Sequence, residues 1–191
     1  ELELREIAVM APDIQEYVPF IEAVFHDIHH SIADRSSKKR NEVFAAFSSF
    51  LHLYSSRFGW NEVLEVLQLP VIHPQFDLSP VDLENLQRWV VEAGIRWGLS
   101  DSQRNEDLGL QSFSENSWEE GLNRLLLGYA MQGENEFQEV IPYQDVEGGA
   151  ARAIGGLAEF IEIVTRVRNL IRQPRLVVEW VELFLVSCDE L

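Results

Sequence analysis

The stretch LQRWVVEAGIRWGL, residues 86–99, decides the fold that this sequence predicts. Apolar residues recur at helical spacing in and just before its first half, which favours a helix with one buried face: Leu83, Leu86, Val90 and Ala93. We expect the helix to stop near Gly94, because glycine readily adopts the left-handed conformation that ends helices. The exit is predicted to be a capping turn in which Trp97 folds back on the core while Arg96 stays in water.

Apolar spacing and capping residues predict further helices on both sides of this stretch. On the N-terminal side they cover residues 14–25, 42–54 and 60–67, and Ser79-Pro80 starts the helix that enters residues 86–99. On the C-terminal side they cover residues 118–131, 150–171 and 176–186. Between them, the polar residues 100–117 are expected to form an excursion on the surface.

Three of these helices carry more detailed predictions. The helix over residues 118–131 is expected to bury four side chains: Leu122, Leu125, Leu126 and Tyr129. Gly155 and Gly156 make the helix over residues 150–171 less certain, because each glycine costs about 1 kcal/mol of helix stability unless another element packs closely there. The last helix is apolar enough to require a covering surface.

The N-terminal residues are predicted to form a small βα element. Residues 5–11 suit a buried strand, Asp13 suits the N-cap of the helix over residues 14–25, and a short strand follows at residues 28–33. The predicted fold is therefore mainly α (α+β). A βα element in residues 1–35 would precede a helical, bundle-like subdomain in residues 36–191.

Composition limits the classes of function. The chain has 191 residues, and its 15 basic against 32 acidic residues give a net charge of −17, which repels phosphate backbones and anionic membranes. Cys188 is the only cysteine, so an internal disulfide is excluded. No apolar run reaches the roughly eighteen residues of a membrane span. These features predict a soluble, cytoplasmic protein.

Two clusters could suggest metal binding, and in both cases we favour solvated loop residues. One contains His26, Asp27, His29 and His30, and the other contains Glu134, Glu136 and Glu139. Nor does the sequence predict catalysis. The only lysines are Lys38 and Lys39, and neither follows glycine as a Walker A lysine must. No Gly-x-Ser-x-Gly nucleophile turn occurs.

Basic residues gather in two places. Arg35, Lys38, Lys39 and Arg40 form the densest cluster, which suits either a solvated turn or phosphate contacts. Near the end of the helix over residues 150–171 lie Arg168, Arg172 and Arg175, where positive charge favours a helix C-terminus. We prefer this structural interpretation of the second group to DNA contact.

Ordered blocks of sequence resemble the RecC family, the gamma subunits of exodeoxyribonuclease V (the RecBCD helicase-nuclease). The most specific are WVxxxGIRWG at residues 89–98 and LLLGYAM at residues 125–131. Other blocks follow in the family's order: IAVMAPDI at 7–14, PFIxAVF at 19–25, IADR at 32–35, Trp118, Gly121-Leu122 and VIPY at 140–143. The sequence also begins without methionine, in mid-pattern. We therefore expect an internal piece of a longer subunit.

The resemblance implies a fold like that of superfamily 1 helicases, with the start of motor domain 2A followed by its 2B insertion. It implies a non-catalytic scaffold in DNA repair by homologous recombination, with RecB-like and RecD-like subunits and DNA as partners and no membrane. No cofactor is expected here, since ATP and Mg²⁺ would belong to the partner subunits. Helping to scan a strand for Chi is also implied, but no motif assigns Chi reading to a residue. The candidate DNA or subunit contacts are Arg35, Lys38, Lys39, Arg40, Arg96 and Trp97. The alternative is an acidic helical adaptor that contacts only protein.

Overall fold

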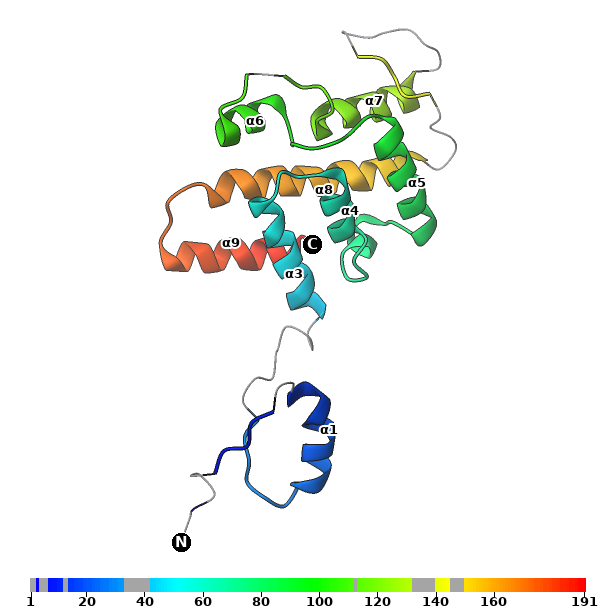
Figure 1. Cartoon of the computed structure of the whole chain (residues 1–191). Coiled ribbons are helices and arrows are strands. Elements are labelled where there is room, and N and C mark those ends of the chain that lie inside the picture. Colours follow the sequence, from blue (N-terminus) through cyan, green and yellow to red (C-terminus); the bar gives the residue numbers. More distant parts are fainter. Residues whose placement is uncertain are drawn as a thin grey trace. The chain divides into compact units, whose positions relative to one another are not determined.

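The computed structural model describes residues 3, 7–11, 14–32, 42–111, 113–131, 140–144 and 150–191. The chain divides into two compact units, Glu1–Glu42 and Val43–Leu191, and each is described by itself (Figure 1).

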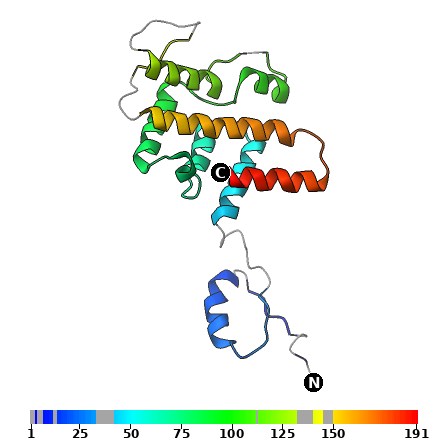
Figure 2. The same ribbon diagram turned by 180° about the vertical axis from the view of Figure 1, so that it is seen from behind.

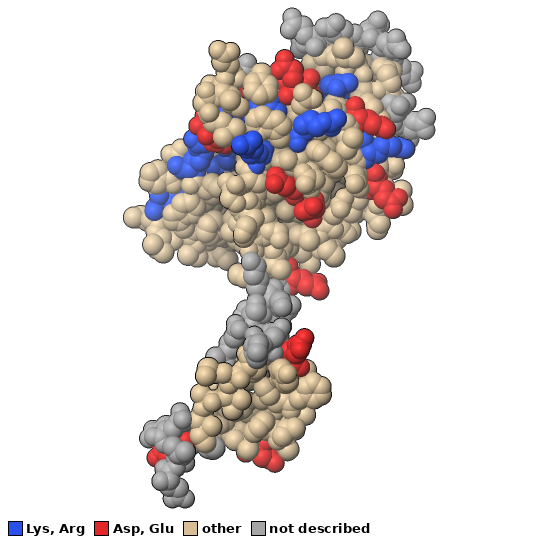
Figure 3. All heavy atoms as spheres, viewed as in Figure 1, with Lys and Arg blue, Asp and Glu red and all other residues tan. Residues whose placement is uncertain are grey.

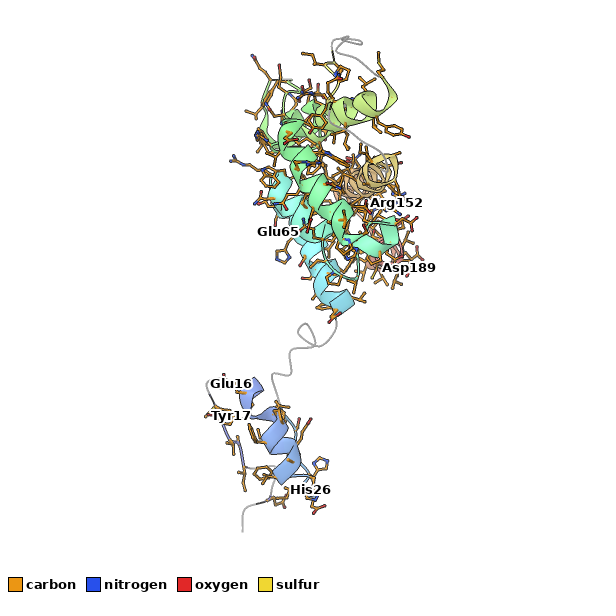
Figure 4. The ribbon with its side chains drawn as sticks, turned by 90° about the vertical axis from the view of Figure 1, so that its right-hand side faces the viewer. Glu16, Tyr17, His26, Glu65, Arg152 and Asp189 are labelled. Carbon is orange, nitrogen blue, oxygen red and sulfur yellow. The ribbon has the colours of Figure 1, made fainter. Side chains whose placement is uncertain are left out.

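The first unit contains one helix in its described part, α1 (Ile14–Val24), as the sequence predicts. The predicted strands are not found, because residues 7–11 and 28–32 have no regular structure. A strand needs a neighbour that takes up its backbone hydrogen bonds, and the described part of this unit supplies none. Apolar side chains are consequently exposed here, Val9 at 85% and Met10 at 92%. Figure 4 labels Tyr17 and His26, which also lie at the surface of this unit.

In the described part of the second unit, the regular elements are helices, apart from an isolated bridge residue at Val140, which confirms the mainly α prediction. Its elements are α3 (Glu42–His52), η2 (Leu53–Ser55), α4 (Trp60–Leu67), η3 (His73–Phe76), α5 (Pro80–Glu92), α6 (Asp101–Leu108), α7 (Trp118–Ala130), α8 (Ala150–Ile171) and α9 (Val177–Asp189). Among these helices and α1, none is long and apolar enough to cross a membrane.

The long helix α8 is the centre of this unit. It packs against α5, α7 and η3, and its Leu157, Phe160 and Val164 are completely buried. The ring of Phe160 lies 5.4 Å from that of Phe76 in η3 and 6.4 Å from that of Phe50 in α3. Figures 1 and 2 show α6 and α7 on one side of α8 and α9 on the other.

Gly156 explains how glycines are tolerated inside α8. A Cβ atom at this position would lie 2.5 Å from the carbonyl oxygen of Phe76, so only glycine allows η3 to approach this closely. A Cβ atom at Gly155 would meet nothing within 4 Å. Close packing therefore requires one of the two glycines and not the other.

The buried face of α7 is narrower than predicted, and that of α3 is also limited. In α7, Leu122 and Leu125 are buried, but Leu126 is 43% and Tyr129 52% exposed. In α3, Val43 and Phe44 in the first turn are half exposed. The 3.6-residue period places each helix correctly, but the width of the contact depends on the neighbouring elements.

Candidate functional site: the turn between α5 and α6

The turn that follows α5 is built on a regular helix cap. Ser79 accepts a hydrogen bond from the backbone N–H of Asp82 and caps the start of α5, while Pro80 occupies the first turn. At the other end Gly94 has a φ of +86°. The N–H of Gly94 donates to the carbonyl of Val91 and the N–H of Ile95 to that of Val90, the pattern of a Schellman motif. The predicted end of the helix near Gly94 is thus confirmed.

Ile95 locks this turn onto α7. Its side chain is completely buried. A Cβ atom at Gly121 in α7 would lie only 2.0 Å from Cγ1 of Ile95. Gly121 therefore provides the space into which Ile95 fits, and this contact joins two of the sequence blocks that resemble RecC.

A buried arginine in α6 holds the rest of the turn. Arg104 is completely buried, and its guanidinium donates to the carbonyls of Phe113 (3.0 Å), Glu115 (2.9 Å) and Trp97. Its Cζ lies 4.2 Å from the ring centroid of Trp97 and 4.4 Å from that of Phe113, within the range of cation–π attraction. Burial lowers the pKa of Arg104 from its ordinary value, whereas the charges of Glu115, Glu120 and Asp101 oppose this effect.

This arrangement corrects the prediction for residues 100–117. They were expected to form a surface excursion, but residues 101–108 form α6, which buries Gln103 and Arg104. The polar composition of α6 suggested exposure. Arg104 is buried because carbonyls from residues before and after the helix bind its guanidinium. The only signal in the sequence is the aromatic pair, Trp97 and Phe113, that flanks the arginine.

The two described candidate contacts, Arg96 and Trp97, lie side by side in this turn. Arg96 is exposed, and its Nη1 donates to the carbonyls of Val91 (3.1 Å) and Ile95 (2.9 Å). Its positive charge thus lies at the C-terminal end of α5, where the helix dipole favours it. Trp97 is half-buried and packs edge-on against Phe113, as expected for a ring folded back on the core. The other four candidates, Arg35, Lys38, Lys39 and Arg40, lie outside the described residues.

Residues 140–143 also pack against this turn. The N–H of Tyr143 donates to the carbonyl of Arg124 in α7, and the Arg124 guanidinium donates to the carbonyls of Ile141 (3.1 Å) and Ala93 (2.6 Å). The Tyr143 hydroxyl donates to the carboxylate of Glu92. A Cβ atom at Gly128 would collide with the Tyr143 carbonyl. The VIPY block is therefore fixed to both α7 and the end of α5.

An ion cluster links α6 to α8. Arg168, whose side chain is 7% exposed, donates to Asp107 (2.6 Å) and Glu106 (3.0 Å), and Arg172 also pairs with Asp107. Burial alone would raise the pKa of Asp107, but hydrogen bonds from Arg168 and Gln103 and the nearby positive charges hold it below its ordinary value. Arg168 is thus an inter-helix contact, which the dipole argument did not predict. Arg175 does follow that argument, since its Nε donates to the carbonyl of Leu170.

Charge is unevenly distributed over this unit. In Figure 3, Lys and Arg side chains gather over the part of the surface that α6, α7 and α8 occupy in Figure 1. Arg152, labelled near the start of α8 in Figure 4, pairs with Asp82 at 2.8 Å. Within the described ranges, no group of three or more His, Cys, Asp or Glu side chains could hold a metal ion. The residues in the turn can thus order backbone carbonyls and present positive charge, and they form no nucleophile–base pair.

Comparison with known proteins identifies the family. A sequence model described as the fourth domain of the RecBCD enzyme subunit RecC matches residues 40–191. The chain belongs to the RecC family. The resemblance seen in the sequence blocks is thereby confirmed, and the blocks at residues 89–98, 118–131 and 140–143 meet at one place in the fold.

Curated RecC proteins are similar over most of this chain. RecBCD enzyme subunit RecC of Escherichia coli (strain K12) is 39% identical over 183 residues, which are 92% of this chain and 16% of the relative. The RecC of Haemophilus influenzae is 29% identical over 94% of this chain and 16% of its own length. That of Mycobacterium tuberculosis (strain CDC 1551 / Oshkosh) is 29% identical over 98% of this chain and 18% of its own length. The chain therefore spans less than a fifth of the length of these relatives.

Proposed function

We propose that this chain is a non-catalytic, helicase-like scaffold segment of the gamma subunit of exodeoxyribonuclease V. It would act in double-strand-break repair by homologous recombination, through contacts to DNA and to RecB-like and RecD-like subunits. The observation that carries the proposal is the match of residues 40–191 to a RecC domain. The first unit would correspond to the start of motor domain 2A and the helical second unit to the 2B insertion.

The chemistry of the residues supports a role without catalysis. An ATPase loop requires a lysine that follows glycine, and the two lysines of this chain follow Ser37 and Lys38. The arginines of the turn bind backbone carbonyls, which suits a rigid frame rather than a reacting site. ATP and Mg²⁺ would accordingly be bound by the partner subunits.

The alternative is an acidic helical adaptor that contacts protein and not DNA. Two observations favour it: the net charge of −17, and the use of Arg96 to cap α5. Nη2 and Nε of Arg96 would remain for a phosphate. The two functions differ in whether the basic residues of this segment contribute to DNA binding by the assembled complex.

Salt dependence of DNA binding distinguishes these functions. The complex would be assembled with the full-length gamma subunit, and anisotropy of a labelled single strand would be measured at several salt concentrations. For single strands, each phosphate contact contributes about 0.7 to the slope of log K against log salt. The scaffold proposal expects a shallower slope for Lys38→Ala/Lys39→Ala/Arg40→Ala, and a smaller change for Arg96→Ala.

Arg88→Ala is the matched control, because Arg88 is exposed on α5 and, among the described residues, forms only a weak hydrogen bond to Asn85 at 3.5 Å. This variant should keep the original slope. Subunit assembly would be checked by sedimentation for every variant. Unchanged slopes in the triple variant and in Arg96→Ala, with assembly intact, would leave the adaptor function.

A further inference from the structure

The last helix, α9, carries apolar side chains on its exposed side as well as on its buried side. Towards the unit, Ser187 is completely buried, and the ring of Phe184 packs at 5.9 Å against Phe47 of α3. On the outside, five aliphatic side chains are more than half exposed: Val177 (80%), Val178 (67%), Val181 (53%), Leu185 (62%) and Val186 (55%). We call these five residues the α9 outer face.

A helix of this composition is not expected to stay uncovered. Helices with apolar side chains on both sides are normally buried, and clusters of exposed apolar side chains mark contact sites. Within the described unit, α9 is held mainly at one side, by the Phe47–Phe184 contact and the Arg166–Glu190 ion pair of 2.5 Å. The outer face contributes to neither contact.

Acidic side chains on the exposed part of α9 indicate the chemistry of the partner. Glu182 and Asp189 are exposed and lie on the same side of the helix as Val178 and Leu185. Neither forms an ion pair with any residue in the described part of the chain. Glu179 is different, because it accepts a hydrogen bond from the N–H of Leu176 and caps the helix. A surface that covers α9 should thus be apolar and carry positive charge opposite Glu182 and Asp189.

The same charges disfavour two other occupants. In a symmetric dimer, the outer faces of two copies would bring carboxylates of like charge together. An anionic lipid surface would be repelled by these carboxylates and by the net charge of −17. A basic, apolar protein surface is the occupant that the charge pattern favours.

We propose that the α9 outer face is a docking surface for another folded region of the same RecC polypeptide, with Lys or Arg opposite Glu182 and Asp189. The inference rests on the proposed scaffold role. This segment spans only 16–18% of the RecC relatives compared above, so most of their polypeptide lies outside it. Covalent connection gives such a region a high effective concentration at the outer face, and modest apolar contact then suffices.

Hydrogen–deuterium exchange tests this directly, by comparing the 191-residue chain with the full-length subunit that contains it. The expected result is that amides of α9 exchange at least tenfold more slowly in the full-length subunit, while those of α5 change little. Val181→Gln/Leu185→Gln in the full-length subunit should return α9 to the faster rate. Glu182→Lys should do so in part, because it places like charges together.

Val81→Gln is the matched control, since Val81 is an aliphatic residue of α5 that is 65% exposed. It should leave α9 exchange unchanged. Equal exchange of α9 in the two proteins would overturn the proposal. A dimer would also overturn it, if the 191-residue chain and the full-length subunit both dimerise as their concentration rises. Val181→Gln/Leu185→Gln would have to abolish this dimer. If subunit assembly and DNA binding persist while α9 exchange is equal, only this docking surface is wrong and the scaffold function stands.

Discussion

The two sides of α8 are stabilised in different ways. On the side of α6 and α7, buried arginines bind carbonyls and carboxylates, and glycines allow close contact with Ile95 and Tyr143. On the side of α9, an aromatic contact, a partly exposed ion pair and the buried Ser187 hold a helix whose outer face is aliphatic. This difference is what the proposed docking surface expects: contacts within the described unit hold the first side, whereas the second would be covered by a surface outside this segment.

The strongest test of the first side is Arg104→Ala. The substitution leaves three backbone carbonyls without their buried donor and removes the group that contacts two rings, so we expect a loss of about 3 kcal/mol or more in the free energy of unfolding. Urea denaturation at pH 7 measures it. Arg104→Lys should recover only part of the loss, since an ammonium group cannot reproduce the guanidinium fork.

Arg88→Ala provides the exposed control for this experiment and should change the free energy of unfolding by less than about 0.5 kcal/mol. If Arg104→Ala were as mild as this control, the buried arginine would not be what orders the turn. The two sides of α8 would then differ less than the contacts indicate.

The paired glycines of α8 give the next largest effect, with opposite signs at adjacent positions. Gly156→Ala should destabilise by about 1–3 kcal/mol, because its methyl group would collide with the Phe76 carbonyl. Gly155→Ala should stabilise by about 0.5–1 kcal/mol, because the site is open and alanine favours a helix. Thermal unfolding followed by circular dichroism would resolve both, and equal effects would contradict the close approach of η3.

The sequence predicted the helices well because their signals are local. Ser79 and Pro80 marked the start of α5, and the 3.6-residue period placed α4 and α8 at the residues where the structure has them. The predicted strands failed because a strand depends on neighbours that the described residues do not include. Arg104 was missed because its partners are backbone carbonyls, and backbone carbonyls carry no signature in the sequence. Arg96 and Trp97 became candidate contacts through the family resemblance, and that role stays a prediction.

Acid should weaken the α6 side of α8 selectively. The pKa of Asp107 is held below its ordinary value in the folded chain, so its ionised form stabilises the fold at pH values above about 4 and this contribution is lost as the pH falls further. The free energy of unfolding should therefore decrease below about pH 4. Asp107→Asn should make that decrease shallower, without abolishing it.

Part of the acid sensitivity would remain in Asp107→Asn because of Asp82. Hydrogen bonds from Ser79 lower the pKa of the Asp82 carboxyl, which caps α5 and pairs with Arg152. An unchanged pH profile in Asp107→Asn would show that the cluster with Arg168 and Arg172 contributes little to stability.

The smallest effect is expected on the α9 side, where Arg166→Ala removes the ion pair with Glu190. The Arg166 side chain is 48% exposed, and pairs of this kind contribute about 0.5 kcal/mol or less. Two residues further along the same helix, the Arg168 side chain is 7% exposed, and Arg168→Ala should cost several times more because it leaves Asp107 partly buried without its main partner. Urea denaturation would measure the loss of stability in both variants. Because both residues are arginines of α8, the difference reports on the two sides of this helix. Equal losses would mean that the ion pairs stabilise α9 and α6 to the same extent. The contrast that supports an external covering surface for α9 would then be absent.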